Sequence, residues 1–214
     1  MKHLFCDQAS ITSGLLHLWG ALMAIVGTVL LILKAEGTLP IVASSIYGTT
    51  LIGLFTASSI FHIFYISSKV HGILQRIDHS LVFCLIAGTY TPICLLVLDH
   101  IPGLVLLICI WSMAFVGILG KVFWFRYGKW FSTIIYLMMG WGIVFFSEPL
   151  TQTLARAALF WLAAGGLCYS VGAILYAADS LQFQFTAFGS HELFHLFVLA
   201  GAGCHFYLMY QFII

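Results

Sequence analysis

The sequence has very few charged residues. Only 7% of its 214 residues are Asp, Glu, Lys or Arg, whereas a soluble domain carries about 25%. So few charges cannot cover a globular surface of this size, which excludes a soluble fold. A net charge of +1 excludes a cationic nucleic-acid binder. The high apolar content excludes a disordered chain.

Paired cysteine motifs are also absent. None of the six cysteines forms a CxxC spacing, and five lie within apolar stretches, where a free thiol behaves as a small apolar side chain. We therefore expect neither a disulfide framework nor a thiolate metal site. No A-x-A-like cleavage site follows the first apolar stretch, at about 13–33, so we expect a retained helix rather than a signal peptide.

Hydrophobic residues, by contrast, make up 62% of the chain and fall into seven runs. The runs lie at roughly 13–33, 41–66, 78–98, 102–120, 130–147, 156–177 and 190–212. Seven spans of about 20 residues use roughly 140 residues and leave too few for a second domain. The runs are too long and continuous for barrel strands. The sequence predicts an all-α membrane protein, a single domain over 1–214 built as a bundle of seven transmembrane helices.

Polar residues and proline indicate where the runs end. Asp99-His-Ile-Pro102 predicts a tight turn between the third and fourth helices, and Glu148-Pro149 predicts the end of the fifth. Residues 67–76 are interpreted as a loop between the second and third helices.

Basic residues in the loops predict the orientation. One side of the bundle carries Lys2, Lys69, Arg76, Lys121, Arg126 and Lys129, and the other carries Lys34 and Arg156. This asymmetry predicts that the N-terminus lies in the cytoplasm and that, after seven spans, the C-terminus lies on the outer side. The membrane is expected to be the cell membrane, that is, the plasma or inner membrane.

Several ionisable residues of the spans fall at one depth in this topology. His62 ends the second helix, Asp78 starts the third, and His191 and His195 start the seventh, all at the cytoplasmic side. His17, in the first turns of the first helix, shares this depth. Ionisable groups inside a membrane are costly, so their convergence indicates a functional site.

The three histidines of this group have the spacing of a metal site. His191 and His195 are four residues apart, so both face one side of a helix, and His62 is the third ligand at the right depth. Three imidazoles leave a fourth zinc position open, as in catalytic sites, where zinc activates water by lowering its pKa to about 7. Asp78 is then the candidate base, and Ser58, one turn before His62, a supporting hydrogen-bonding group.

Other interpretations of these residues remain open. Single histidines in membrane helices often only hydrogen-bond within the packing, and Ser58 is small enough to serve close helix approach. The string from His191 to His195 also matches HExxH, in which Glu192 would be the base of a protease. However, no acidic residue follows Glu192 to complete such a site, so we expect Glu192 to face a loop or a helix end.

At these residues the sequence resembles the hemolysin III branch of the progestin and adiponectin receptor (PAQR) family. The resemblance rests on Ser58-Ser-Ile-Phe-His62, on Arg76-Ile-Asp-His-Ser80 with Ala87-Gly-Thr-Tyr-Thr-Pro92, and on the segment from His191 to Phe206. Together with the span count, these blocks extend the resemblance over essentially the whole chain.

The resemblance implies a seven-helix fold with a cytoplasmic N-terminus and one zinc ion. It assigns zinc to His62, His191 and His195, and support of the water to Ser58 and Asp78. The segment around His17 departs from the family pattern, because Thr12 is not adjacent to that histidine. No role is therefore carried over to it.

These residues suggest a zinc-dependent hydrolase for a lipid amide or ester, such as a ceramide-like lipid, with membrane lipids as partners and no nucleic acid. The lipid substrate class is implied by the family and by burial. The alternative is a non-enzymatic sensor, receptor or hemolysin-type channel in which zinc only joins helices. Nearly unbroken apolar spans lack the polar rings of a wide pore. Gly165-Gly166 hints at a transporter with a broken helix.

Overall fold

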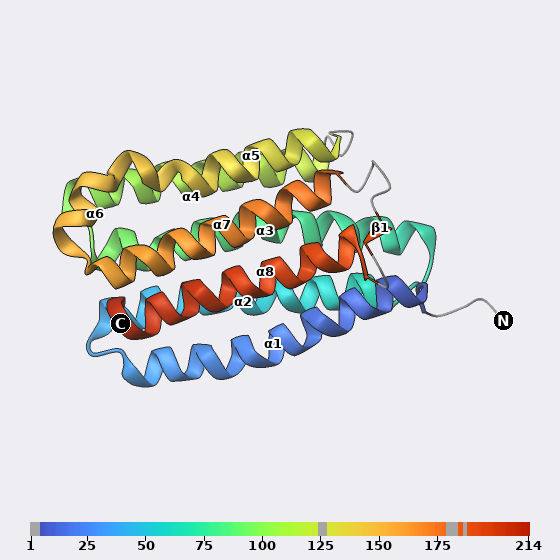
Figure 1. The fold of residues 1–214 in the computed structure, drawn as a ribbon, viewed down its shortest axis with the longest axis horizontal. Helices are drawn as coiled ribbons and strands as arrows, with labels where there is room; N and C mark the ends of the chain where they lie inside the picture. Colours follow the sequence, from blue (N-terminus) through green and yellow to red (C-terminus); the bar gives the residue numbers. More distant parts are fainter. Residues whose placement is uncertain (1–4, 124–127, 179–183, 186–187) are drawn as a thin grey trace.

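The computed structural model describes residues 5–123, 128–178, 184–185 and 188–214. Its helices run side by side along one long axis (Figure 1). In this part of the chain seven helical segments are long and apolar enough to cross a membrane, which confirms the predicted all-α class and span count.

The spans correspond to seven long helical segments with short connections. They are α1 (Gln8–Lys34), α2 (Thr38–Ile63), α3 (Ser68–Leu96), α4 (His100–Phe123), α5 (Lys129–Trp141) continued by a 3-10 turn (Gly142–Phe146) and α6 (Ser147–Thr153), α7 (Arg156–Ala178), and α8 (Ser190–Leu208) continued by a π-helical turn (Met209–Ile213). A pair of two-residue antiparallel strands, β1 (Gln184–Phe185) and β2 (Phe188–Gly189), precedes α8.

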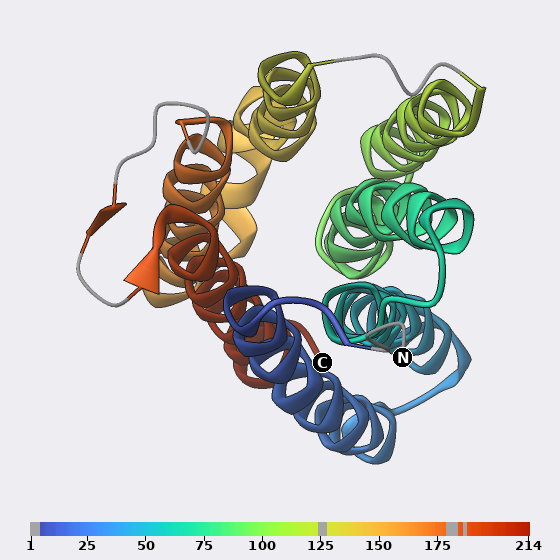
Figure 2. The same cartoon turned by 90° about the vertical axis from the view of Figure 1, so that its right-hand side faces the viewer.

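The helices form a ring when viewed along the bundle axis (Figure 2). Consecutive helices α1 to α4 pack against one another, α7 packs against α8, and α1 against α8 joins the two groups. By contrast, α5 packs mainly against α7 and touches α3 only lightly. The ring therefore has a loosely packed side at α5.

The outer surface of the bundle is apolar along every span. Examples are Trp19 on α1, Phe115 on α4 and Phe160 on α7, whose side chains are 58%, 63% and 63% exposed. So extensive an exposed apolar surface is unfavourable in water and is satisfied by lipid chains. The chain is a multi-pass membrane protein.

Two predicted boundaries were wrong. The third helix begins at Ser68 rather than near residue 78. The Ser67 side chain accepts a hydrogen bond from the Val70 N–H (3.3 Å) and so caps the N-terminus of a helix whose first turns are polar. Glu148-Pro149 does not end the fifth span. Pro149 lies in the first turn of α6, where its missing N–H has no intrahelical partner to lose. A tight connection between the third and fourth helices is present, but it lies at 97–99 rather than 99–102, because α3 ends at Leu96 and α4 begins at His100.

Gly165 and Gly166 do not break a helix, because α7 is continuous from Arg156 to Ala178. A Cβ atom on Gly165 would lie 2.2 Å from Cδ2 of His205 on α8. The glycine therefore permits close packing of α7 on α8, and the hint of a broken transporter helix is not supported.

The irregular end of α5 is held by one tyrosine. The Tyr90 hydroxyl of α3 lies 2.7 Å from the Met139 carbonyl oxygen and 2.8 Å from that of Gly140, and it accepts the Ile143 N–H at 2.9 Å. It thus satisfies backbone groups where α5 changes to the 3-10 turn. This contact fixes α5 against α3 across the centre of the ring.

Candidate metal centre and cavity

Three histidines converge at the end of the bundle where α8 begins. His62 lies in the last turn of α2, and His191 and His195 lie in the first turns of α8. One ring nitrogen from each falls within 4.8 Å of the other two. The rings of His62 are centred 5.0 Å and 4.7 Å from those of His191 and His195. The structure thus brings together all three predicted ligands.

The spacing of one pair of these nitrogens is that of two ligands on a zinc ion. Nitrogens bound tetrahedrally to zinc at about 2.0–2.1 Å lie roughly 3.3 Å apart. The Nε2 atoms of His191 and His195 are 3.1 Å apart. Imidazole is a preferred zinc ligand, and three of them leave one position open. The three residues could therefore hold a metal ion, and one of their three pairs already has the separation that zinc requires.

Ser10 of α1, which sequence reasoning missed, fixes the ring of His62. Its Oγ donates to the His62 carbonyl oxygen (3.1 Å) and lies 3.1 Å from His62 Nδ1. We assign the hydroxyl proton to the carbonyl, which can only accept, and the serine oxygen then accepts from the Nδ1–H. This tautomer leaves Nε2 of His62 as the nitrogen with a free lone pair for a metal.

Contacts of residues 5–7 with the end of α2 help to hold Ser10 next to His62. Asp7 caps α1 by accepting the Ser10 N–H at 2.8 Å, and Phe5 pairs with Phe64 in an antiparallel bridge. The Cys6 N–H donates to the Ile63 carbonyl oxygen at 3.2 Å. Burial raises the pKa of the Cys6 thiol, which lies just outside the spans. The chain start is thereby attached to the end of α2.

His17 of α1 supports His195 in the same way. Its Nε2 lies 2.9 Å from Nδ1 of His195, and the two rings are centred 4.1 Å apart. His17 is 2% exposed and His195 is 1% exposed, so bulk solvent does not compete for this contact. With Nδ1 of His195 engaged by His17, its Nε2 faces His191. The outer partners of two ligands therefore both come from α1.

Asp78 and Ser58 lie beside the histidines rather than among them. Both side chains are buried, at 8% and 1% exposed, and both line the cavity described below. Asp78 does not join the close group formed by the three histidine nitrogens. The partner of His62 Nδ1 is Ser10, and the supporting role of Ser58 stays a prediction. The pair Asp78–Ser58 is thus placed to act on a molecule bound next to the histidines.

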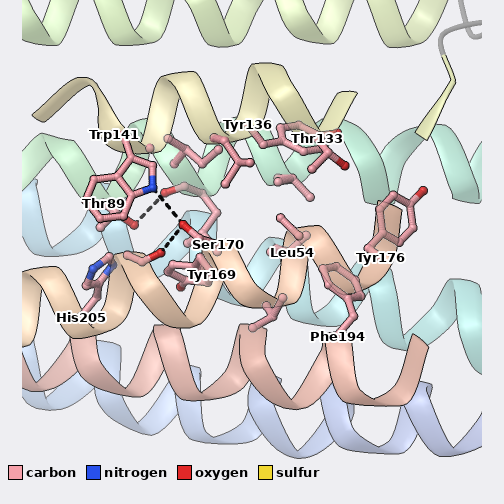
Figure 3. A pocket seen from close by; sticks show the side chains of 18 of the residues that line it. Leu54, Thr89, Thr133, Tyr136, Trp141, Tyr169, Ser170, Tyr176, Phe194 and His205 are labelled. Carbon is pink, nitrogen blue, oxygen red and sulfur yellow. Dashed lines mark hydrogen bonds between the residues drawn. The ribbon is translucent and has the colours of Figure 1, made fainter. Parts of the chain in front are cut away.

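A cavity of about 510 Å³ joins these groups and runs along the inside of the ring. Its walls at the histidine end include His62, His191 and Asp78, and its lining continues to Leu150 of α6. Figure 3 shows its middle and far parts, with Tyr136 from α5 and Tyr169 and Ser170 from α7 among the lining side chains. The cavity has the size of a small-ligand site.

Polar contacts also mark the far part of the cavity. Trp141 donates from Nε1 to Ser170 Oγ at 2.9 Å, drawn as a dashed line in Figure 3. His205, ten residues beyond His195, lies at this far part, and its Nε2 is 3.2 Å from the Leu162 carbonyl oxygen. Since a carbonyl only accepts, His205 donates there and serves the packing of α8 on α7.

Glu192 and His79 occupy different surroundings from the triad. Glu192 folds back toward its own helix start, where a Cβ atom on Gly189 would lie 2.8 Å from its Oε2. Glu192 is not one of the residues that line the cavity. The geometry therefore gives no support to the hypothesis of an HExxH protease site. His79 does line the cavity, and its Nε2 lies 3.5 Å from the Tyr176 hydroxyl.

Comparison with known proteins gives a consistent result. The model of the family described as "Haemolysin-III related" matches residues 8–206. The chain is 36% identical to "Hemolysin-3" of Bacillus cereus over 203 residues, covering 94% of this chain and 90% of that protein. It is 35% identical to the "Hemolysin-3 homolog" of Bacillus subtilis over 207 residues, covering 95% and 94%. The human "Monocyte to macrophage differentiation factor" is 27% identical over 208 residues, covering 92% and 81%.

Proposed function

The chain belongs to the haemolysin-III related family, and from this premise and the geometry of the cavity we propose that it is a zinc-dependent hydrolase of a lipid amide or ester, such as a ceramide-like lipid. One observation carries the proposal. Two members of the three-histidine group, His62 and His191, and Asp78 line the same cavity, which is long, largely apolar and enclosed by membrane helices. A purely structural metal site needs neither an open side nor a neighbouring cavity.

Each residue of the site then has a role. His62, His191 and His195 hold the metal, while Ser10 and His17 orient His62 and His195. When bound, zinc polarises the substrate carbonyl and lowers the pKa of a water molecule.

The protein's remaining part in the chemistry falls to Asp78 and Ser58. Asp78 takes up the proton that the attacking water loses and returns it to the leaving amine or alcohol as the C–N or C–O bond breaks, while Ser58 orients the Asp78 carboxyl group. The apolar walls hold the acyl chain and exclude bulk water from the reacting carbonyl. By the basic-residue count, we propose that this end of the bundle faces the cytoplasm.

The metal is tested first, by elemental mass spectrometry of the detergent-purified protein. We expect about one zinc per chain, and its loss in a His191→Ala/His195→Ala variant. His100→Ala is the matched control, because His100 is exposed at the start of α4. A folded wild-type protein without bound metal would refute every zinc-based proposal.

Turnover is tested with Asp78→Asn, which keeps the shape of the side chain and removes its basicity. With the protein in lipid nanodiscs and a ceramide as substrate, released fatty acid is measured by mass spectrometry. We expect the variant to keep its zinc and to lose at least about a hundredfold in rate. Equal rates in the wild type and the variant would remove Asp78 from the mechanism.

The alternative is that zinc only joins helices of a sensor, receptor or channel. One observation favours it: α2 and α8 are not among the closely packed helix pairs, yet the three histidines bring the ends of these two helices together. In that case Asp78→Asn leaves function unchanged, whereas loss of zinc lowers the stability of the bundle.

A further inference from the structure

The end of the cavity opposite the histidines is lined by branched apolar side chains from several helices. Ile93 of α3, Leu150 of α6 and Leu159 of α7 line it, together with Ile143 from the 3-10 turn that follows α5. Ile93, Leu150 and Ile143 are 1%, 3% and 9% exposed and belong to the packed core, against which Leu159 also packs. We call these four residues the cavity floor.

The irregular end of the fifth span supplies two residues of the floor. Ile143 and Leu150 are seven residues apart, a spacing that puts two side chains on the same face of a helical segment. The turn that carries Ile143 is attached to α3, because the Tyr90 hydroxyl accepts the Ile143 N–H at 2.9 Å. Phe145 lies in the same turn but is 91% exposed and is not one of the residues that line the cavity. The sequence thus alternates a floor residue with an outward residue within one turn.

The distance from Asp78 to the cavity floor is that of an extended acyl chain. Asp78 and Ile93 both line the cavity and lie on α3, and the rise between them is about 22 Å at 1.5 Å per residue. The hydrocarbon core of a bilayer is about 30 Å thick for two leaflets, so one acyl chain covers roughly 15 Å of it. Because acyl chains in a bilayer are bent, the same chain is longer when extended. An acyl chain whose carbonyl lies beside Asp78 therefore brings its methyl end to the floor.

We propose that the cavity floor limits the length of the acyl chain that the protein accepts, and that Leu150 and Ile143 determine this limit. A chain that fits ends against the floor, whereas a longer chain must displace packed side chains, which is costly. The proposal rests on the proposed function in treating the cavity as the site for the acyl chain of a neutral lipid amide or ester. It adds a chain-length selectivity to that function. Binding of the chain itself needs neither the metal nor turnover.

The test uses saturated primary alcohols, which are neutral, carry one alkyl chain and cannot be hydrolysed. The full-length protein in detergent micelles is incubated with equimolar pairs of alcohols of neighbouring length, over a series of about 12 to 24 carbon atoms that brackets membrane acyl chains. Native mass spectrometry gives the ratio of the two bound alcohols. We expect this ratio to fall at least about fivefold against the longer alcohol once its chain exceeds the cavity. A ratio without such a fall would overturn the proposal, because the chain would then leave the cavity sideways.

Variants assign the length limit to the floor. Leu150→Ala empties part of the floor, so we expect the limit to move to chains that are longer by about two carbon atoms. Leu150→Phe fills the same space and should move the limit to shorter chains. Ile143→Ala tests the floor at a second position. Phe145→Ala is the matched control, because Phe145 lies in the same turn as Ile143 but outside the cavity lining. Comparison with the wild type cancels the partitioning of each alcohol into the micelles.

Failure of this proposal is distinguishable from failure of the proposed function. A length limit in a protein that binds no zinc supports the role of the floor and refutes the hydrolase. Normal zinc content and ceramide turnover without a length limit overturn the role of the floor alone. Thermal unfolding verifies that each variant is folded. An unchanged limit in every folded floor variant, or an equal shift in Phe145→Ala, also overturns the proposal.

Discussion

Replacing Ser10 by alanine tests whether the outer hydrogen bonds of the histidines set the metal affinity. The Ser10 hydroxyl makes two contacts with His62, at 3.1 Å to Nδ1 and 3.1 Å to the carbonyl oxygen. His62 is 6% exposed, so in Ser10→Ala its Nδ1–H is left in the interior without this acceptor. An unsatisfied buried polar group costs about 1–3 kcal/mol. If that cost falls on the metal-bound tautomer, zinc affinity drops about 5-fold to 150-fold.

The assay is a competition titration of zinc against a fluorescent chelator, with the protein in detergent micelles. The matched control is Thr12→Ala, which also removes one hydroxyl from the first turns of α1. Thr12 and Ser10 are both half-buried, but the Thr12 hydroxyl donates to the Gln8 carbonyl oxygen within its own helix. We expect the control to bind zinc as the wild type does. Ser10→Thr, which keeps the hydroxyl, is expected to retain most of the affinity.

Equal zinc affinity in Ser10→Ala, Thr12→Ala and the wild type would refute the reasoning. It would mean that the ring of His62 is oriented by its packing, for example against Phe61, whose ring is centred 4.6 Å away. A loss of affinity accompanied by an equal loss in Thr12→Ala would instead indicate fraying of α1. Only a loss confined to Ser10→Ala supports the tautomer assignment.

Three further predictions concern stability. A Cβ atom on Gly88 would lie 2.1 Å from Thr50 Oγ1, so Gly88→Ala should lower the free energy of unfolding by about 1–3 kcal/mol, measured by thermal unfolding. In the control Gly140→Ala, the added Cβ atom meets nothing within 4 Å, so the free energy of unfolding should be unchanged or slightly higher. Tyr90→Phe leaves the Ile143 N–H and two carbonyl groups without their hydroxyl partner and should cost about 1–3 kcal/mol, measured in the same way. Chelation of zinc should lower the melting temperature of the wild type and not that of the triad variant, since free zinc at 1,000 times its Kd stabilises by about 4 kcal/mol.

The number and order of the spans follow from hydropathy, but the helix ends do not. An apolar run reports where a chain lies in lipid, whereas a helix starts where its first backbone groups are capped. Ser67 caps α3 well outside the apolar run, and Pro149 starts a helix because it lies in its first turn rather than its interior. Sequence reasoning that equates a run with a helix misplaces both boundaries.

The candidate site could be predicted from the sequence because burying its ionisable side chains in a membrane is costly and because these side chains fall at one depth. His62, His191 and His195 needed only the topology to be grouped. Ser10 and His17 could not be assigned, because their roles depend on which face of α1 meets α2 and α8. The repeated small residues of α1 carry part of that information. A Cβ atom on Gly14 would lie 3.1 Å from the backbone nitrogen of Ile63, so α1 presents Gly14 to the end of α2.

The way the ring is held together bears on the choice between hydrolase and metal-joined bundle. A zinc ion that only joins α2 to α8 would require no polar group beyond the three histidines and their partners on α1. Yet Asp78 on α3 and Lys121 on α4 also turn inward, each at a cost in desolvation that a packed apolar wall would avoid. Lys121 joins α4 to α5 through its hydrogen bond to Ser132 Oγ, whereas Asp78 lies on α3, which already packs closely against α2 and α4. An inward carboxyl group on a helix that needs no further joining is most simply explained by a polar molecule that enters the cavity beside the histidines, and this favours a substrate site.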